Sequence, residues 1–126
     1  MKKLLLMLLV CFKSHAGEMD CLAEIVYREA NTQTLTEQNH IIQTVKNRVK
    51  DPRWPDNICQ VMKQPGQFPW YNHRTHQYRY TLDNLKTVIT HNHTPTSATY
   101  FHSYPNKTYW KHLTYINQVG KHHFYK

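Results

Sequence analysis

Apolar residues recur at the i, i+3, i+4 spacing of an amphipathic helix in three stretches of the sequence. The stripes consist of Leu22, Ile25 and Val26; of Ile41, Ile42, Val45 and Val49; and of Leu82, Leu85, Val88 and Ile89. They predict helices over residues 21–30 and 36–50 and a third helix capped by Thr81. Residues 17–20, before the first helix, are expected to be a short leader. Thr34 and Glu37 fit a capping box before the second helix.

The stretch between the second and third helices, residues 51–80, is predicted to be irregular because four prolines interrupt it. It is rich in aromatic residues, namely Trp54, Phe68, Trp70, Tyr71, Tyr78 and Tyr80. Such density argues against disorder and favours a functional loop. Further along the chain, residues 97–102 and 122–125 are candidate strands, and residues 105–108 are predicted to form a turn. The secondary structure of residues 109–119 is ambiguous from the sequence. The pattern predicts a mainly helical (α+β) domain with a small β element.

The first apolar stripe ends in an acidic residue, because position i+7 after Leu22 is Glu29. A carboxylate is rarely placed among apolar side chains unless it is paired or has a chemical role. Desolvation disfavours the charged form, so such a group can stay protonated and donate its proton to a leaving group. The alternative is structural, with Glu29 in an ion pair with Arg28 or Lys50 at the helix end.

Glycosidic bond cleavage needs such an acid and usually a second carboxylate about 5–10 Å away. The chain has only 8 acidic residues. Glu24 lies about 140° around the predicted helix from Glu29 and so points elsewhere, and no other acid has an evident claim. A glycosidase built from this chain would therefore work with one carboxylate and help from the substrate.

The N-terminus has the pattern of a secretory signal peptide. Lys2 and Lys3 precede an apolar run over residues 4–12, and Ser14-His15-Ala16 fits a signal-peptidase site. We expect residues 1–16 to be the signal peptide of a protein exported to the periplasm or the extracellular wall; an uncleaved anchor is the alternative. Cleavage would leave 13 basic and 8 acidic residues, a net charge of +5 against +8 for the whole chain. This balance suits an anionic partner.

Two of the 3 cysteines, Cys21 and Cys59, follow the predicted signal peptide. An even pair in an exported chain predicts a Cys21–Cys59 disulfide, which would contribute about 3–4 kcal/mol. Two free buried thiols are the alternative.

Five motifs follow one another in the chain. They are Cys21-Leu22-Ala23 with Tyr27-x-Glu29-Ala30; Gln38 with Asn47-Arg48-Val49; Pro55 with Cys59-x-Val61, Gln64 and Gln67-Phe68-x-Trp70; Ala98-Thr99-Tyr100-Phe101-His102; and Gly120-Lys121-His122-His123-Phe124-Tyr125. This order resembles the spore-cortex-lytic-enzyme-like cell wall hydrolases over almost all of residues 17–126. The family often continues its Glu-Ala with Arg-Gly-Glu, whereas residues 31–33 are Asn-Thr-Gln here, so a second family acid is missing.

The resemblance implies that residues 17–126 form a lysozyme-like catalytic domain that cleaves the glycan strands of peptidoglycan. It implies a lytic transglycosylase in which Glu29 protonates the oxygen between N-acetylmuramic acid and N-acetylglucosamine. The same carboxylate then takes the proton of the C6 hydroxyl, which closes a 1,6-anhydro ring. We expect the enzyme to need no cofactor and no metal and to bind no nucleic acid. We also expect it to be a monomer that contacts the cell envelope only transiently. A hydrolytic muramidase, such as a phage endolysin, is the alternative.

Aromatic and amide side chains suit a sugar polymer, because sugars present apolar ring faces together with hydroxyl groups. The candidate substrate-binding residues are Asn47, Gln67, Phe68, Trp70, Tyr100, Phe101, His102 and His122. Asn47 could instead hold a loop, and Phe68 and Trp70 could simply be core residues. The same composition would also suit single-stranded nucleic acid.

A metal-dependent amidase is the nearest rival activity, because the chain has 10 histidines, including His91-Asn92-His93 and His122-His123. Neither an H-E-x-x-H motif nor a cysteine cluster accompanies them in the sequence. A non-enzymatic binder of nucleic acid or cell wall is the second rival, and it would leave Glu29 unexplained.

Overall fold

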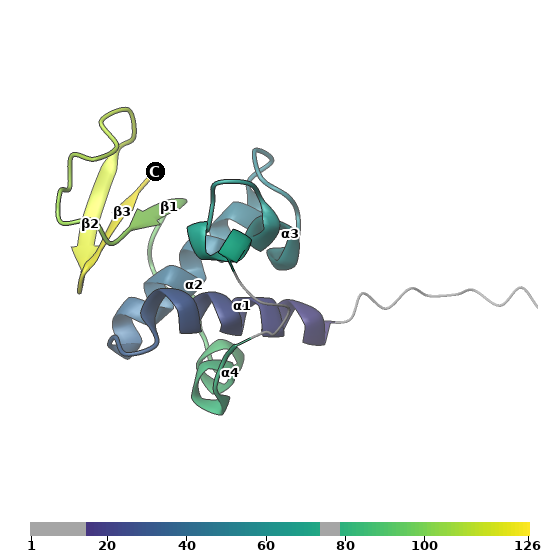
Figure 1. The fold of residues 1–126 in the computed structure, drawn as a ribbon. Coiled ribbons are helices and arrows are strands. Elements are labelled where there is room, and N and C mark those ends of the chain that lie inside the picture. The colour runs from purple at the N-terminus through teal and green to yellow at the C-terminus, as the bar shows by residue number, and fades with distance from the viewer. Residues whose placement is uncertain (1–14, 74–78) are drawn as a thin grey trace, which may run out of the picture.

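The computed structural model describes residues 15–73 and 79–126 of the chain. Within these residues the elements are α1 (His15–Ala30), α2 (Leu35–Lys50), α3 (Ile58–Lys63), the 3₁₀ helix η1 (Pro69–His73), α4 (Leu82–Ile89), β1 (Tyr100–His102), β2 (Tyr115–Val119) and β3 (His122–Tyr125). Helices α1 and α2 pack in the middle, α3 and α4 lie on opposite sides of α1, and the small sheet stands to one side (Figure 1). The predicted mainly helical fold with a small β element is confirmed.

Helix α1 begins six residues before the predicted start, so the leader predicted at 17–20 is helical instead. Its first turns are polar and leave no apolar stripe to detect. Tertiary contacts hold them: Glu18 accepts the backbone N–H of Ile58 at 3.1 Å, and Asp20 accepts the hydroxyl of Tyr80 at 2.6 Å. The predicted signal peptide, residues 1–16, lies outside the described residues except for its last two, which begin α1.

The prediction of an irregular segment over 51–80 is wrong for α3 and η1, which are too short to show a helical period. Asn57 caps α3 by accepting the N–H of Gln60 at 3.0 Å, and Val61 and Met62 bury its inner face. The predicted disulfide is present: Cys21 and Cys59 join α1 to α3 across 38 residues of sequence. Tyr78, one of the aromatic residues of this segment, lies outside the described residues.

The predicted cap by Thr81 is confirmed at α4, whereas the capping box predicted for α2 forms only in half. Thr34 accepts the N–H of Glu37 as expected, whereas the Glu37 carboxylate turns into the protein and meets His122. At α4 the full reciprocal box forms between Thr81 and Asn84. The apolar face predicted for α4 is only partly buried, because Leu82 and Ile89 at its two ends are 83% and 58% exposed.

The sheet is antiparallel, with β3 between β1 and β2. All four residues of β3 are buried, which agrees with the last predicted strand, while β1 is shorter than the predicted 97–102. Gly120 has a φ of +58° in the tight turn that joins β2 to β3. Apolar residues of α1 and α2 and Phe124 of β3 belong to one core cluster, so the sheet is fixed against the helices. No helix in the described part of the chain is long and apolar enough to cross a membrane.

Candidate active site

An open cleft of about 530 Å³ lies between two loop walls. Residues 66–70, which include the first two residues of η1, form one wall, and residues 101–104 with 109–110, from the end of β1 and the loop that follows it, form the other. Glu29 from the last turn of α1 and Arg48 from the last turn of α2 complete the lining. The cleft therefore draws its groups from distant parts of the sequence, and the core helices position its two charged groups.

Glu29 lies at the border between the core and the cleft, with its side chain 19% exposed. Its Oε1 accepts the indole N–H of Trp70 at 2.9 Å, and its Oε2 lies 3.9 Å from Nε2 of His122. The salt bridges among the described residues do not include the alternative ion pair of Glu29 with Arg28 or Lys50. The Arg28 guanidinium instead stacks over Trp70, 5.3 Å from the centre of its ring. Among the described residues Glu29 is thus held by one donor, Trp70, and it faces the cleft.

Arg48 places a buried positive charge beside the cleft. It is 2% exposed, its Nε donates to the carbonyl oxygen of Thr99, and its guanidinium lies 5.7–6.0 Å from four aromatic ring centres. Desolvation lowers the pKa of Arg48 to about 10, although the charges of Tyr100 and Glu29 act to raise it. Arg48 therefore remains a cation at neutral pH, buried beside the cleft.

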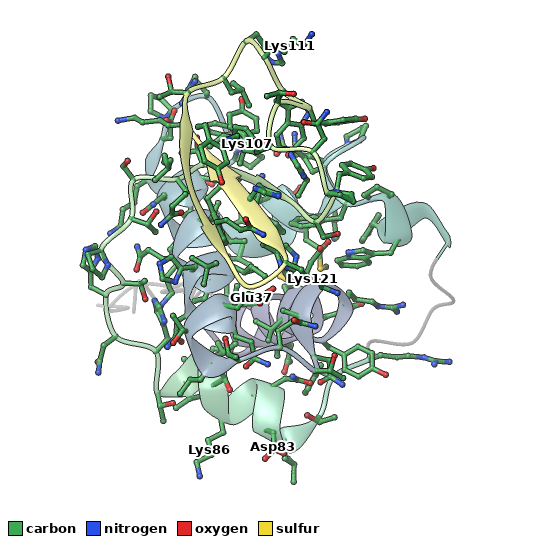
Figure 2. The ribbon with its side chains drawn as sticks, turned by 90° about the vertical axis from the view of Figure 1, so that its left-hand side faces the viewer. Glu37, Asp83, Lys86, Lys107, Lys111 and Lys121 are labelled. Carbon is green, nitrogen blue, oxygen red and sulfur yellow. A yellow bond between two sulfur atoms is a disulfide. The ribbon has the colours of Figure 1, made fainter. Side chains whose placement is uncertain are left out.

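Behind Glu29 lies a fully buried pair formed by the carboxylate of one residue and the imidazole of another. Glu37 and His122 are each 1% exposed, and Oε2 of Glu37 lies 2.5 Å from Nδ1 of His122. Figure 2 shows Glu37 near the turn between β2 and β3, where Lys121 is also labelled. Gly120 makes room for this pair, because a Cβ atom at Gly120 would lie 1.6 Å from Oε1 of Glu37.

The family model of the cell wall hydrolases matches residues 32–125. The chain belongs to the cell wall hydrolase family. The predicted family is thereby confirmed, and as a member this protein is an enzyme that degrades cell wall peptidoglycan. Glu29 lies three residues before the matched region begins.

Two solved structures are similar to this cell wall hydrolase over most of its length. One is the catalytic domain of the germination-specific lytic transglycosylase SleB from Bacillus anthracis, with 22% identity and a TM-score of 0.73 over 87% of this chain and 94% of that chain. The other is the catalytic domain of the Bacillus cereus SleB protein, with 20% identity and a TM-score of 0.74 over 88% and 91%. These likenesses confirm the predicted lysozyme-like fold. No curated protein matches the chain.

Five of the eight predicted substrate-binding residues of the hydrolase line the cleft, namely Gln67, Phe68, Trp70, Phe101 and His102. Phe68 and Phe101 are only 3% and 8% exposed, so they offer the cleft little more than a ring edge. Gln67 and Trp70 are half-buried and present both an amide and an aromatic surface.

The other three, Asn47, Tyr100 and His122, are not in the cleft walls. Asn47 donates to the carbonyl oxygens of Thr96 and Ala98 at 3.0 and 2.9 Å, which ties α2 to the segment before β1. These bonds favour the loop-holding role over contact with an N-acetyl group. Tyr100 packs edge-on against Trp54 and Trp110.

His102 fixes the second wall through a chain of hydrogen bonds. The N–H of Tyr104 donates to Nδ1 of His102 at 3.1 Å, so the ring proton is on Nε2 and is donated to the hydroxyl of Tyr125 at 2.7 Å. That hydroxyl in turn donates to the carbonyl oxygen of Lys107. Burial, followed by the charges of His123 and His122, lowers the pKa of His102, so a neutral ring is favoured.

The outer part of this wall, formed by Tyr104, Tyr109 and Trp110, is not predicted by the sequence patterns. Tyr104 and Tyr109 are 50% and 55% exposed, and their ring centres are 4.6 Å apart. We call these three residues the aromatic rim. The only signal in the sequence was the presence of three aromatic residues in a segment that showed no apolar period. Lys107 and Lys111 lie on the same loop (Figure 2).

The histidines proposed as metal ligands belong to separate hydrogen-bond networks. Nδ1 of His122 contacts Glu37, and Nδ1 of His123 contacts the hydroxyl of Tyr115. The two ring nitrogens of His91, Nδ1 and Nε2, each lie 3.2 Å from a side-chain amide oxygen, that of Asn39 and that of Gln43 respectively. Among residues 15–73 and 79–126, no group of three or more His, Cys, Asp or Glu could hold a metal ion.

Proposed function

We propose that this cell wall hydrolase is a lytic transglycosylase that cleaves the bond between N-acetylmuramic acid and N-acetylglucosamine, with Glu29 as the catalytic acid. One observation carries the proposal: among the described residues that line the cleft, Glu29 is the only carboxylic acid. A reaction in which one carboxyl group serves as acid and then as base fits this arrangement. The similar domain from Bacillus anthracis belongs to a lytic transglycosylase, which points the same way.

The steps follow from the groups around Glu29. The protonated carboxyl group gives its proton to the glycosidic oxygen, and the bond from this oxygen to C1 of the muramic acid breaks. Trp70 donates to the carboxylate that results, and the buried cation of Arg48 stabilises its charge. The carboxylate then removes the proton of the C6 hydroxyl as O6 bonds to C1. Glu29 is protonated again at the end, so no water is consumed.

A hydrolytic muramidase remains the second candidate, because the same acid could serve it. Hydrolysis with inversion would need another carboxylate to activate water. Glu24 and Glu37 are 0% and 1% exposed and are absent from the cleft walls, so neither presents a carboxylate to a bound sugar. This burial favours the transglycosylase.

The experiment that tests the proposal is mass spectrometry of the muropeptides released from purified peptidoglycan. We expect products that end in 1,6-anhydromuramic acid, which are lighter by one water than reducing-end products. Reducing-end products would show that water attacks and would replace the proposal with the muramidase. Release of free peptides without glycan cleavage would point to an amidase.

The aromatic rim is proposed to bind sugar rings beside the scissile bond. Tyr109→Ala is expected to raise KM about fivefold, since one exposed ring face contributes on the order of 1 kcal/mol, while kcat stays nearly unchanged. Tyr109→Phe, which keeps the ring, is the matched control and should resemble the wild type. An unchanged KM for the alanine variant on soluble glycan fragments would remove Tyr109 from the binding surface.

We also propose that residues 1–16 direct export, because peptidoglycan lies outside the cytoplasmic membrane. Residues 17–126 would then act as a monomeric catalytic domain. The contact with the envelope would be transient, and the positive charge of the chain would serve attraction to the wall rather than binding of nucleic acid.

A further inference from the structure

Three side chains from distant parts of the sequence meet behind the cleft in the order Glu37, His122, Glu29. The first contact, between Oε2 of Glu37 and Nδ1 of His122, is a short one of 2.5 Å. The second, between Nε2 of His122 and Oε2 of Glu29, is longer, at 3.9 Å. Nε2 of His122 is buried and has no hydrogen-bond partner among the described residues. A buried polar atom of this kind calls for an explanation.

The partners fix where the protons lie. A buried carboxylate accepts hydrogen bonds, so Nδ1 of His122 carries a hydrogen and donates it to Glu37. On Glu29, Oε1 accepts the indole N–H of Trp70. In the protonated form of Glu29 that the proposed function requires, the hydrogen is therefore on Oε2, the oxygen atom that faces Nε2 of His122.

We propose that His122, oriented by Glu37, is a positioning residue that orients the protonated carboxyl group of Glu29 before it transfers its proton. This inference rests on the proposed function of Glu29. With its hydrogen on Nδ1, the imidazole of His122 presents Nε2 as an acceptor 3.9 Å from Oε2 of Glu29, a separation that must shorten for the carboxylic acid to donate a hydrogen bond to it. The transferred proton still passes from Glu29 to the glycosidic oxygen and returns from the C6 hydroxyl, so His122 adds no step and consumes no proton.

Burial excludes the simpler role of sugar contact for His122. Its side chain is 1% exposed, and the rings of Phe101 and Phe124 pack beside it with centres 5.7 and 6.4 Å away. A histidine with a purely structural role would be expected to use both ring nitrogens, whereas within the described part of the chain only Nδ1 has a close partner. The free nitrogen is the one that faces the catalytic carboxyl group.

Two substitutions separate the two ring nitrogens. In His122→Asn the side-chain amide lies where Nδ1 was and can still donate to Glu37, but nothing faces Glu29. In His122→Gln the amide reaches toward the former place of Nε2. We expect kcat on purified glycan strands to fall roughly 10- to 100-fold in His122→Asn with KM within about twofold, and to recover partly in His122→Gln.

The matched control is His123→Asn, one residue further along β3. Its ring contacts the hydroxyl of Tyr115 instead of Glu29, and it is 4% exposed, so it tests the general effect of removing a buried histidine from this strand. We expect its kcat to stay within about twofold of the wild type once thermal unfolding shows that both variants are folded. A kcat for His122→Asn no lower than that of His123→Asn would overturn the proposal.

A second measurement applies even if the His122 variants do not fold. Nitrogen-15 NMR of the wild type and of Glu29→Gln should show a change in the Nε2 resonance of His122 and little change in Nδ1. An Nε2 resonance that is insensitive to Glu29→Gln would overturn the proposal. The two hypotheses fail in different ways: an active Glu29→Gln enzyme refutes the proposed function, whereas an inactive Glu29→Gln enzyme with a fully active His122→Asn refutes only the role of His122.

Discussion

Glu29→Gln is expected to lower the rate of glycan cleavage by roughly a thousandfold while leaving the fold intact. Glutamine has the same shape, and its amide oxygen can still accept the indole N–H of Trp70, which in the wild type bonds to Oε1 at 2.9 Å. What it lacks is an acidic proton for the leaving group. The loss should therefore appear in kcat, with KM nearly unchanged, because the cleft walls remain in place.

The measurement is the release of muropeptides from purified peptidoglycan at several substrate concentrations, with thermal unfolding followed in parallel. Asp83→Asn is the control for removal of an acidic residue, because Asp83 lies on α4, is exposed, and is absent from the cleft walls (Figure 2). Wild-type release by Glu29→Gln, with Asp83→Asn also active, would end the assignment of Glu29 as the catalytic acid.

A charged residue on an apolar helical stripe was the most informative feature of the sequence. It identified Glu29, which the structure places in the cleft. The same signal exists at Arg48, seven residues after Ile41 and three after Val45, where it marks a cation instead of a carboxylate. Arg48 is 2% exposed and lines the same cleft. The rule should therefore be applied to cations as well as to carboxylates.

Glu37 shows how a local explanation can hide a long-range one. Its position fitted a capping box, and the Thr34 half of that box forms. The Glu37 side chain, however, bonds to His122, which is 85 residues away in the sequence. Capping boxes are defined by four neighbouring residues, so no local pattern could reveal that the carboxylate was needed elsewhere.

The remaining misses have the same physical origin. Helix α3 has only 6 residues, fewer than two turns, and contacts from α1 hold it rather than an apolar period of its own. The aromatic rim depends on where the loop between β1 and β2 is placed, and the hydrogen bonds of His102 and Tyr125 fix that placement. Sequence patterns therefore predicted the long helices, the disulfide, the catalytic candidate and five residues of the cleft walls, but not the aromatic rim that completes the second wall.

Removal of the Cys21–Cys59 disulfide is expected to lower the free energy of unfolding by about 3–4 kcal/mol. The bond joins residues 38 apart in sequence, so its loss gives the unfolded chain considerable conformational freedom. It also connects α1, which carries Glu29, to the short helix α3 that precedes one wall of the cleft. Neither cysteine lines the cleft itself, so activity at low temperature should be largely retained.

The test is urea unfolding of the Cys21→Ser/Cys59→Ser double variant against the protein with both cysteines. Cys11 is replaced by serine in both proteins, so that no third thiol can exchange. We expect a lower midpoint together with a steeper dependence on urea, because an unfolded chain without the cross-link exposes more surface. A reducing agent should lower the midpoint of the cysteine-containing protein to that of the double variant. If the two proteins unfold at the same midpoint under oxidising conditions, the bond does not stabilise the native state.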